Sequence, residues 1–365
     1  MFSAADHTYM SQAMRLAEQG LYTATPNPRV GCVIVRDEKV VGEGWHARAG
    51  EPHAEILALR QAGALAKDST AFVTLEPCNH YGRTPPCTDA LIKAGVARVV
   101  TAMPDPNPLA AAAEGLKKMQ TAGIQVTSGL LQQEACELNK GYVARMTRGT
   151  PWLRVKTASS LDGKSALNNG VSQWITGADA RRDAHHWRAC SCAILTGIGT
   201  VLADDPLLNV RDVETSRQPL RVVMDSDLRM PPSAKMLAGG SVLIIAAVED
   251  RARQEKLRAN GAEVLALAGS SGKVDLKRVL EMLAQRGINE VMVEAGRTLN
   301  GALIEADLVD ELVMYMAPIL LGDKARGMFE LPELTEMNGR RELDVRDVRM
   351  VGRDLRICAR LSGKE

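Results

Sequence analysis

The stretch Ala71-Phe72-Val73-Thr74-Leu75-Glu76-Pro77-Cys78 runs from an apolar segment directly into a cysteine. Its first five residues are typical of a short buried strand, which ends at the Glu-Pro-Cys step. Strand and helix signals alternate around it. A helix is expected over about 5–19, strands over 30–35 and 39–44, a helix from 53, and helix–strand pairs over 89–102 and 115–127. This alternation predicts an α/β layered domain with helices covering a sheet.

A second α/β series follows a polar, mostly helical segment, Leu138 to Pro151. A chain of 365 residues is longer than a single core usually takes, so we expect two domains, 1–147 and 148–365. In the second, strands are expected at 153–157, 192–196, 220–224, 242–246, 290–294 and 311–317, and helices at 179–189, 251–260 and 275–286.

The composition favours small-molecule chemistry. The formal net charge is +1 and aromatic residues make up 3%, whereas nucleic-acid-binding proteins more often have excess basic residues and stacking aromatics. The sequence contains neither a long apolar run nor a secretory signal, and its seven cysteines, an odd number, favour reduced thiols. We therefore expect a cytoplasmic protein with no nucleic-acid or membrane partner. We also expect a homo-oligomer.

Three short motifs have the order of a zinc site: His53-Ala54-Glu55, Pro77-Cys78 and, after eight intervening residues, Cys87. One imidazole and two thiolates give zinc three protein ligands and leave the fourth tetrahedral position for water, which marks a catalytic site. Glu55 lies two residues past the histidine and can act as the general acid and base without binding the metal. This order is the signature of zinc-dependent nucleobase deaminases.

Each of these motifs taken alone has a simpler interpretation. A single His-x-Glu is usually a surface helix end, and two cysteines nine positions apart are usually unrelated core residues. Because the motifs occur together, in this order and on the expected helix and strand elements, a functional zinc site is the favoured interpretation. A structural zinc would need a fourth ligand, for which His80 is the nearby candidate. The remaining cysteines are expected to be packing residues: Cys32, Cys136, Cys190, Cys192 and Cys358.

Longer motifs surround this pattern: Thr25 to Gly31, Gly44-Trp45-His46, Glu76 to Cys87 and Asp105 to Pro108. Together they resemble the RibD family of bacterial bifunctional riboflavin biosynthesis enzymes, over nearly the whole chain. The resemblance implies a cytidine-deaminase-like three-layer α/β/α domain that binds Zn²⁺. This domain would replace the 2-amino group of 2,5-diamino-6-(5-phosphoribosylamino)pyrimidin-4-one with oxygen. Pocket candidates, which are alternatively turn and loop residues, are Asn27, His80 and Arg83.

The second half contains no G-x-G-x-x-G motif. Gly197-Ile198-Gly199-Thr200 comes closest, but Leu202 stands where the third glycine belongs. At Val293 to Ala302 a strand runs into a helix, whose backbone N–H groups could bind a pyrophosphate beside Arg297. On spacing alone, a plain strand-to-helix connection is the favoured interpretation.

Motifs at 156–164, 172–177, 199–206 and 294–296 resemble the reductase domain of the same family, whose α/β fold is similar to dihydrofolate reductase. The resemblance implies that NADPH reduces the ribosyl group of the deaminated ribotide to ribityl, by hydride transfer to C1′. It assigns NADPH to Ala158, Trp174, Thr200, Asp204, Ser226, Gly296, Arg297, Thr298, Leu299, Asn300, Gly301 and Ala302. It assigns the substrate to Ser172, Arg188, Leu208, Arg211 and Glu294, with the two arginines suited to the 5′-phosphate. Lys156, Asp162 and Glu294 are ionisable candidates for proton transfer.

Three other hypotheses remain open at this point. The chain could be a tRNA or other nucleic-acid deaminase with an appended binding domain, which predicts a basic face bearing aromatics. It could be a structural zinc module joined to a cofactor-shaped binding domain. Finally, only one of the two halves could be active.

Overall fold

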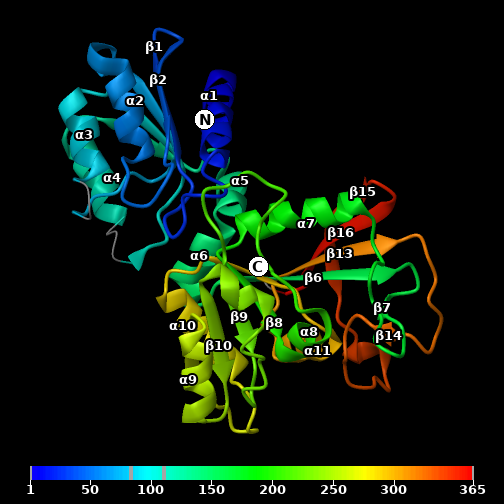
Figure 1. Cartoon of the computed structure of the whole chain (residues 1–365). Helices are drawn as coiled ribbons and strands as arrows, with labels where there is room; N and C mark the ends of the chain where they lie inside the picture. The colour runs from blue at the N-terminus through cyan, green and yellow to red at the C-terminus, as the bar shows by residue number, and fades with distance from the viewer. Residues whose placement is uncertain (1, 82–84, 109–111, 364–365) are drawn as a thin grey trace. The chain divides into compact units, whose positions relative to one another are not determined.

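The computed structural model describes residues 2–81, 85–108 and 112–363. The chain divides into two compact units, Met1–Thr150 and Pro151–Glu365, and each is built from one main sheet with helices on its faces (Figure 1). Within these described ranges, no helix combines the length and the apolar character that a membrane crossing needs.

The first unit contains a mixed sheet with the strand order β2-β1-β3-β4-β5. β1 pairs antiparallel with β2 and β3, whereas β3, β4 and β5 run parallel. The strands are β1 (Gly31–Arg36), β2 (Lys39–Trp45), β3 (Thr70–Leu75), β4 (Arg98–Met103) and β5 (Gln125–Ser128). The helices are α1 (Ala4–Glu18), α2 (Ala54–Ala62), α3 (Cys87–Ala94), α4 (Ala112–Thr121), α5 (Gln132–Leu138) and α6 (Lys140–Arg148).

Glycines let two helices approach opposite faces of this sheet. Gly44 pairs with Cys32, and a Cβ on Gly44 would lie 2.8 Å from the backbone nitrogen of Ala58 in α2. Gly31 precedes Cys32 and therefore faces the other side, where a Cβ would lie 2.8 Å from the nitrogen of Ala17 in α1. The result is the predicted three-layer arrangement, with α1 and α2 separated by the sheet (Figure 1).

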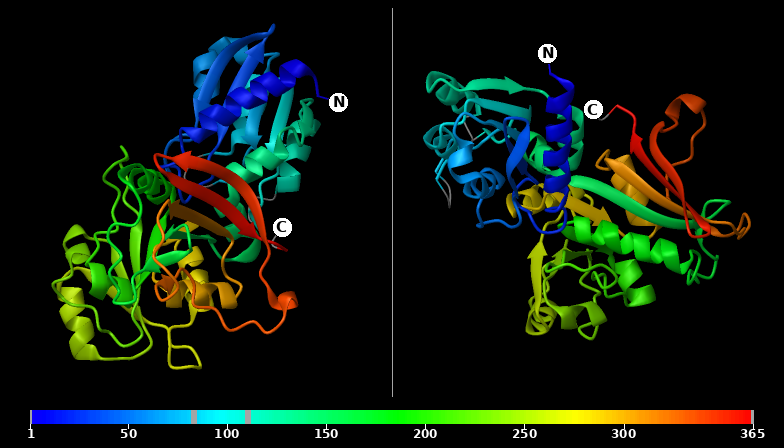
Figure 2. Two further views of the ribbon diagram at one scale, coloured as in Figure 1. Left: turned by 90° about the vertical axis from the view of Figure 1, so that its right-hand side faces the viewer. Right: turned by 90° about the horizontal axis from the view of Figure 1, so that it is seen from above.

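The second unit has a larger sheet with the order β11-β10-β9-β8-β12-β6-β13-β16-β15. All pairings from β11 to β13 are parallel, and the hairpin β15–β16 adds two antiparallel strands at one edge (Figure 2). The strands are β6 (Trp152–Ser160), β7 (Lys164–Ala166), β8 (Ala193–Gly197), β9 (Leu220–Met224), β10 (Val242–Ala246), β11 (Ala262–Ala266), β12 (Glu290–Val293), β13 (Glu311–Ala317), β14 (Arg326–Gly327), β15 (Leu343–Val351) and β16 (Asp354–Leu361). The helices are α7 (Ala178–Cys190), α8 (Ile198–Asp204), α9 (Arg251–Ala259), α10 (Leu276–Gln285) and α11 (Arg297–Glu305).

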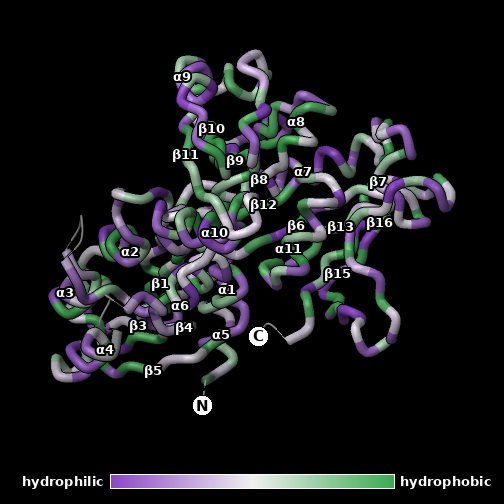
Figure 3. The backbone as a smooth tube through the Cα atoms, turned by 90° about the horizontal axis from the view of Figure 1, so that it is seen from below, coloured by the Kyte–Doolittle hydropathy of each residue, from purple (hydrophilic) through white to green (hydrophobic). Residues whose placement is uncertain are grey.

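Apolar residues fill both faces of this sheet, as expected for parallel strands covered on two sides. Leu195 of β8 packs in the cluster that contains residues of α10 and α11, whereas the preceding Ile194 packs with residues of α8 and α9. The near-continuous apolar character of such strands is visible for β9 and β10 in Figure 3. The second unit is therefore also a layered α/β domain.

The edge strand β15 presents apolar side chains to solvent. A β-bulge between Val345 and Asp347 shifts the register by one residue. As a result Leu343 and Val345, before the bulge, share a face with Val348 and Met350, after it. These four side chains are between 40 and 63% exposed. We call them the β15 apolar face.

Candidate functional sites

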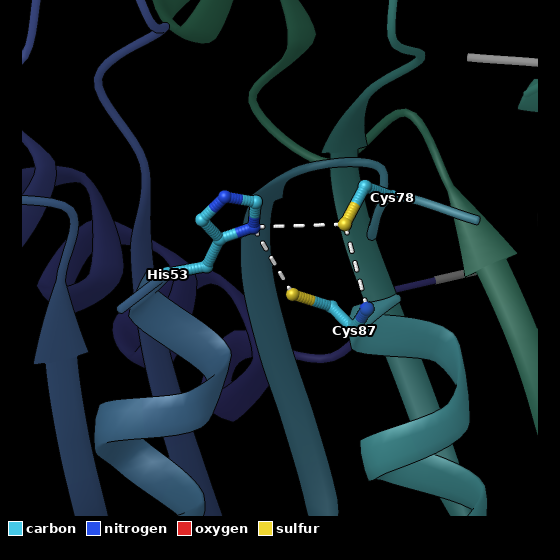
Figure 4. Close-up of side chains that lie close together, drawn as sticks. All are labelled: His53, Cys78 and Cys87. Carbon is cyan, nitrogen blue, oxygen red and sulfur yellow. Dashed lines mark hydrogen bonds between the residues drawn. The ribbon is translucent and has the colours of Figure 1, made fainter. Parts of the chain in front are cut away.

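Three predicted ligand residues lie together in the first unit, each at the end of a different element. His53 immediately precedes α2, Cys78 follows β3, and Cys87 is the first residue of α3. The Nδ1 atom of His53 lies 3.3 Å from Sγ of Cys87 and 3.5 Å from Sγ of Cys78 (Figure 4). The three ligand atoms lie within 4.8 Å of one another, a nitrogen–sulfur–sulfur set suited to zinc.

The two thiols differ in their protonation. Hydrogen bonds from Cys87 and then from His53 lower the pKa of Cys78 to about 4. The pKa of Cys87 is raised because it hydrogen-bonds the Cys78 sulfur and is buried. The backbone N–H of Cys87, at the start of α3, also donates to the Cys78 sulfur over 3.4 Å. The protein groups alone thus favour a thiolate at Cys78 beside His53, whose pKa is raised by that hydrogen bond.

Glu55 lies in the first turn of α2 and is only 3% exposed. Burial and then the charge of Cys78 raise the pKa of its carboxyl to about 7. Among the residues that the structure describes, the group of metal-ligating atoms comprises His53, Cys78 and Cys87 and includes neither Glu55 nor the exposed His80. A set of three ligands beside a titratable carboxyl is the arrangement of a catalytic metal site.

His46 is a buried histidine that lies in the motif Gly44-Trp45-His46 but had no predicted role, and it contacts one of the predicted pocket residues. The Nε2 atom of His46 lies 3.0 Å from Nδ2 of Asn27, and its Nδ1 atom lies 3.2 Å from the carbonyl oxygen of Pro52. Because the Pro52 carbonyl can only accept, Nδ1 of His46 donates to it and Nε2 accepts from the Asn27 amide N–H. The amide oxygen of Asn27 takes no part in this hydrogen bond. The third pocket candidate, Arg83, lies outside the described residues.

In the second unit, most of the predicted site residues lie at or beyond the carboxyl ends of parallel strands, where ligands bind in open α/β sheets. Ala158 is in β6, Thr200 and Asp204 are in α8 after β8, Ser226 follows β9, and Glu294 follows β12. Gly296 caps α11, which contains residues 297–302. Leu208 and Arg211 follow α8, Arg188 is in α7, and Ser172 and Trp174 follow β7.

Nearly buried charges surround Glu294, because the side chains of Glu294, Arg188 and Lys156 are between 11 and 19% exposed. The guanidinium of Arg188 donates to both of its carboxylate oxygens, from Nε over 2.5 Å and from Nη2 over 3.0 Å. Nζ of Lys156 lies 3.8 Å from the same carboxylate. Burial alone would raise the pKa of Glu294, but the charge and hydrogen bonds of Arg188 lower it to about 2. Nη1 of Arg188 also donates to the Asn209 carbonyl, so three hydrogen bonds within the protein hold this arginine.

The residues predicted to contact NADPH differ in accessibility. Trp174 is 69% exposed, with the guanidinium of Arg181 4.6 Å from its ring centroid. Gln173 donates to the carboxylate of Asp204 over 3.1 Å.

The predicted NADPH contacts at the start of α11 include both exposed and buried residues. Arg297 and Thr298 are exposed, yet both donate to the carboxylate of Glu330, over 3.2 and 2.6 Å. Asn300 is buried, donating to the carbonyls of Ala295 and Met328, and Gly301 packs against the backbone of Glu330. The accessible part of this segment is therefore Gly296 to Thr298.

Comparison with known proteins assigns each half of the chain to a protein family. Residues 3–103 match the model of the cytidine and deoxycytidylate deaminase zinc-binding region, and residues 151–357 match that of the RibD C-terminal domain. The chain is 48% identical to riboflavin biosynthesis protein RibD of Escherichia coli, over 98% of this chain and 99% of that protein. It is 45% identical to its counterpart in Haemophilus influenzae, over 98% and 97%.

Solved structures agree over the full length. Acinetobacter baumannii RibD matches with a TM-score of 0.91 and 45% identity, covering 98% of this chain and 99% of that chain. The diaminohydroxyphosphoribosylaminopyrimidine deaminase/5-amino-6-(5-phosphoribosylamino)uracil reductase of Thermotoga maritima matches with a TM-score of 0.86 and 31% identity, with the same coverage. The predicted fold class, a deaminase-like α/β domain followed by an α/β reductase domain, is thereby confirmed.

Proposed function

The chain belongs to the RibD family of riboflavin biosynthesis proteins, and from this we propose that it performs two successive reactions on one pyrimidine ribotide. The domain at 1–147 hydrolytically deaminates 2,5-diamino-6-(5-phosphoribosylamino)pyrimidin-4-one and releases ammonia. The domain at 148–365 uses NADPH to reduce the ribosyl group of 5-amino-6-(5-phosphoribosylamino)uracil to ribityl. The substrate is a small molecule, not a nucleic acid or a membrane component.

The observation that carries this proposal is the group formed by His53, Cys78 and Cys87 beside the buried Glu55. The donor set fits Zn²⁺, and these three residues would hold it with one tetrahedral position left for the reaction. When bound, zinc supplies a Lewis acid that activates water near neutral pH. Glu55 would accept one proton from the attacking water and deliver it to the ring nitrogen, and it would then pass the second proton of that water to the leaving amine, which departs as ammonia. A carboxyl with a pKa of about 7 can both accept and donate near neutrality.

The substrate pocket of the deaminase half includes Asn27 and His80. Because His46 accepts from the Asn27 amide nitrogen, the amide oxygen of Asn27 is oriented to accept a hydrogen bond from the pyrimidine edge. His80 is exposed beside the ligand Cys78 and can reach a substrate that enters from solvent.

The reductase half binds NADPH along the carboxyl edge of its parallel strands, a proposal supported by the position of most expected contact residues at or beyond these strand ends. When bound, NADPH supplies the hydride. The free N–H groups at the start of α11 bind the pyrophosphate, with Gly296 allowing close approach. The other cofactor contacts proposed are Ala158, Trp174, Thr200, Asp204, Ser226, Arg297, Thr298 and Leu299, with Asn300, Gly301 and Ala302 shaping the helix beneath.

The substrate of the reductase half is held by Ser172, Arg188, Leu208, Arg211 and Glu294. Three of the five N–H donors of Arg188 bind Glu294 and the Asn209 carbonyl, so this residue also fixes the position of the carboxylate. Arg211 is exposed and is the better placed of the two arginines to bind the 5′-phosphate.

We also propose a homo-oligomer in the cytoplasm. The β15 apolar face (Leu343, Val345, Val348 and Met350) supports self-association, because exposed apolar side chains on an edge strand favour pairing with a second copy. All seven cysteines are free, which suits a reducing compartment.

The proposal is tested by supplying the purified full chain with the diaminopyrimidine ribotide and NADPH and following ammonia and NADPH oxidation together. Both signals are expected, in that order. His53→Ala should lose zinc and ammonia release, but it should still oxidise NADPH when given the deaminated intermediate. Ammonia release from an RNA oligonucleotide, with none from the ribotide, would overturn the proposal.

Glu55→Gln separates catalytic from structural zinc. This variant should keep its zinc and lose deamination by a factor on the order of 10² or more. A zinc-loaded Glu55→Gln protein that deaminates at the wild-type rate would show that the metal is structural.

A further inference from the structure

A small hairpin between β11 and α10 carries hydroxyl groups and a positive charge at its tip. Its sequence is Ala268-Gly269-Ser270-Ser271-Gly272-Lys273-Val274, closed by an antiparallel bridge between Ala268 and Val274. The N–H of Gly269 donates to the Lys273 carbonyl over 2.7 Å, and Gly272 turns the chain at φ +73°. The side chains of Ser270, Ser271 and Lys273 are exposed as a result.

The hairpin is attached to the carboxyl edge of the sheet. The backbone N–H of Val274 donates to Oγ of Ser226, the second residue after β9, over 3.3 Å. The Ser226 carbonyl in turn accepts from the N–H of Ala247, which follows β10. Lys273 is therefore held next to the ends of β9 and β10, one residue from the contact with Ser226.

The positive charge of Lys273 also acts on Glu330, whose carboxylate accepts hydrogen bonds from Arg297 and Thr298 of α11. A hydrogen bond from Thr298 and the charges of Arg297 and Lys273 lower the pKa of Glu330. Within the described ranges, no carboxylate forms an ion pair with Lys273, and no hydrogen bond involves the side chains of Ser270 or Ser271. Among the described residues, an ammonium without an ion pair and two hydroxyls without a hydrogen bond thus lie beside the end of β9, where Ser226 is proposed to contact the dinucleotide.

We propose that Lys273, together with the hydroxyls of Ser270 and Ser271, binds the 2′-phosphate of the dinucleotide and makes the reductase half prefer NADPH to NADH. This inference rests on the proposed NADPH-dependent reduction. The 2′-phosphate is the group that distinguishes the two cofactors, and an ammonium with neighbouring hydroxyls recognises a phosphate as a point charge with hydrogen-bond donors.

The acidic neighbour of Ser226 does not oppose this assignment. A carboxylate at this position of a nucleotide fold can hydrogen-bond the 2′-hydroxyl of NADH and repel a phosphate. Here the carboxylate of Asp227 lies 3.8 Å from Nε of Arg229, and the Asp227 carbonyl accepts from Arg253 over 3.1 Å. Arg229 therefore offsets part of the negative charge of this carboxylate.

The test measures nucleotide binding without catalysis. Isothermal titration calorimetry on the full chain would compare adenosine 2′,5′-bisphosphate with adenosine 5′-monophosphate. The wild-type chain should bind the bisphosphate about tenfold more tightly, the lower end of what a charged hydrogen bond contributes. Lys273→Ala should remove that difference and leave the monophosphate affinity unchanged. Lys277→Ala, which removes an exposed lysine in the first turn of α10, should keep it.

Steady-state reduction of the deaminated substrate gives the second measurement. In Lys273→Ala, kcat/KM for NADPH should fall about tenfold while that for NADH stays constant. The inference is overturned if this variant keeps the wild-type preference in either measurement, or if the wild-type chain binds the two adenosine nucleotides equally. A wild-type chain that oxidises neither cofactor would instead refute the proposed reduction and the inference with it.

Discussion

Replacing Glu294 by glutamine is expected to destabilise the Pro151–Glu365 unit by about 3 kcal/mol at pH 7. The carboxylate is nearly buried, and it accepts two hydrogen bonds from Arg188 and lies 3.8 Å from Lys156. Removing one partner of such a pair leaves buried charge uncompensated, which costs about 3–5 kcal/mol. The lowering of its pKa from 4.5 to about 2 corresponds to a similar value, about 3 kcal/mol at about 1.4 kcal/mol per pKa unit.

The pH dependence follows from the direction of that shift. A carboxyl whose pKa is lower in the folded state stabilises the fold fully above its unfolded pKa, near 4.5, and loses this contribution as the pH falls toward 2. The difference between wild type and Glu294→Gln should therefore be constant from pH 8 to about 5 and shrink below that. Substituting Arg188→Met in the same chain should restore part of the loss, because both buried charges are then removed.

Urea unfolding of the full chain, followed by tryptophan fluorescence, measures this effect. Of the four tryptophans, Trp152, Trp174 and Trp187 belong to this unit, so the signal reports mainly on it. Zinc content of the first unit serves as the internal control and should not change. The reasoning fails if Glu294→Gln unfolds at the wild-type urea concentration, or if the double variant loses the sum of the two single losses.

Three further predictions concern the first sheet, the metal and the β15 apolar face. Gly44→Ala places a Cβ 2.7 Å from that of Leu57 and should destabilise the first unit by about 1–3 kcal/mol, measured by urea unfolding together with zinc retention; wild-type stability would contradict the close approach of α2. Removing zinc with a chelator should abolish ammonia release and leave reduction of the deaminated intermediate intact, and a parallel loss of both would contradict independent sites. Val345→Lys with Val348→Lys should lower the mass found by sedimentation velocity to that of the monomer, since charges on an edge strand oppose pairing; an unchanged oligomer would exclude the β15 apolar face as the contact.

Elements with a clear apolar period were predictable to within a few residues. The expected strands at 220–224 and 242–246 coincide with β9 and β10, and the helix expected at 251–260 is α9, Arg251–Ala259. The metal site was predictable for a related reason, because local sequence places His53 at a helix start and Cys78 at a strand end. The fold then brings these ends together, as it does for all layered α/β domains.

The elements that sequence reasoning missed lack such a period or depend on distant partners. β15 alternates apolar and polar residues, but the extra residue at Arg346-Asp347 interrupts the alternation, so the strand gives no continuous signal. The helix α8 begins at Ile198, within Gly197-Ile198-Gly199-Thr200, where two glycines weaken the helix signal. The contacts of Arg297 and Thr298 with Glu330 join positions more than thirty residues apart through an irregular segment, which no local pattern could indicate.

The positions of the two thiol ligands have a consequence for how this enzyme class can diversify. Cys78 comes three residues after β3, its carbonyl accepts from the N–H of Thr88 in α3, and Cys87 is the first residue of that helix, so contacts outside the segment between the two ligands hold both of them. That intervening segment is free to lengthen, shorten or change composition while the metal geometry persists. Substrate range and metal chemistry can therefore evolve separately at this site, with new specificities arising by exchange of one loop on an unchanged catalytic frame.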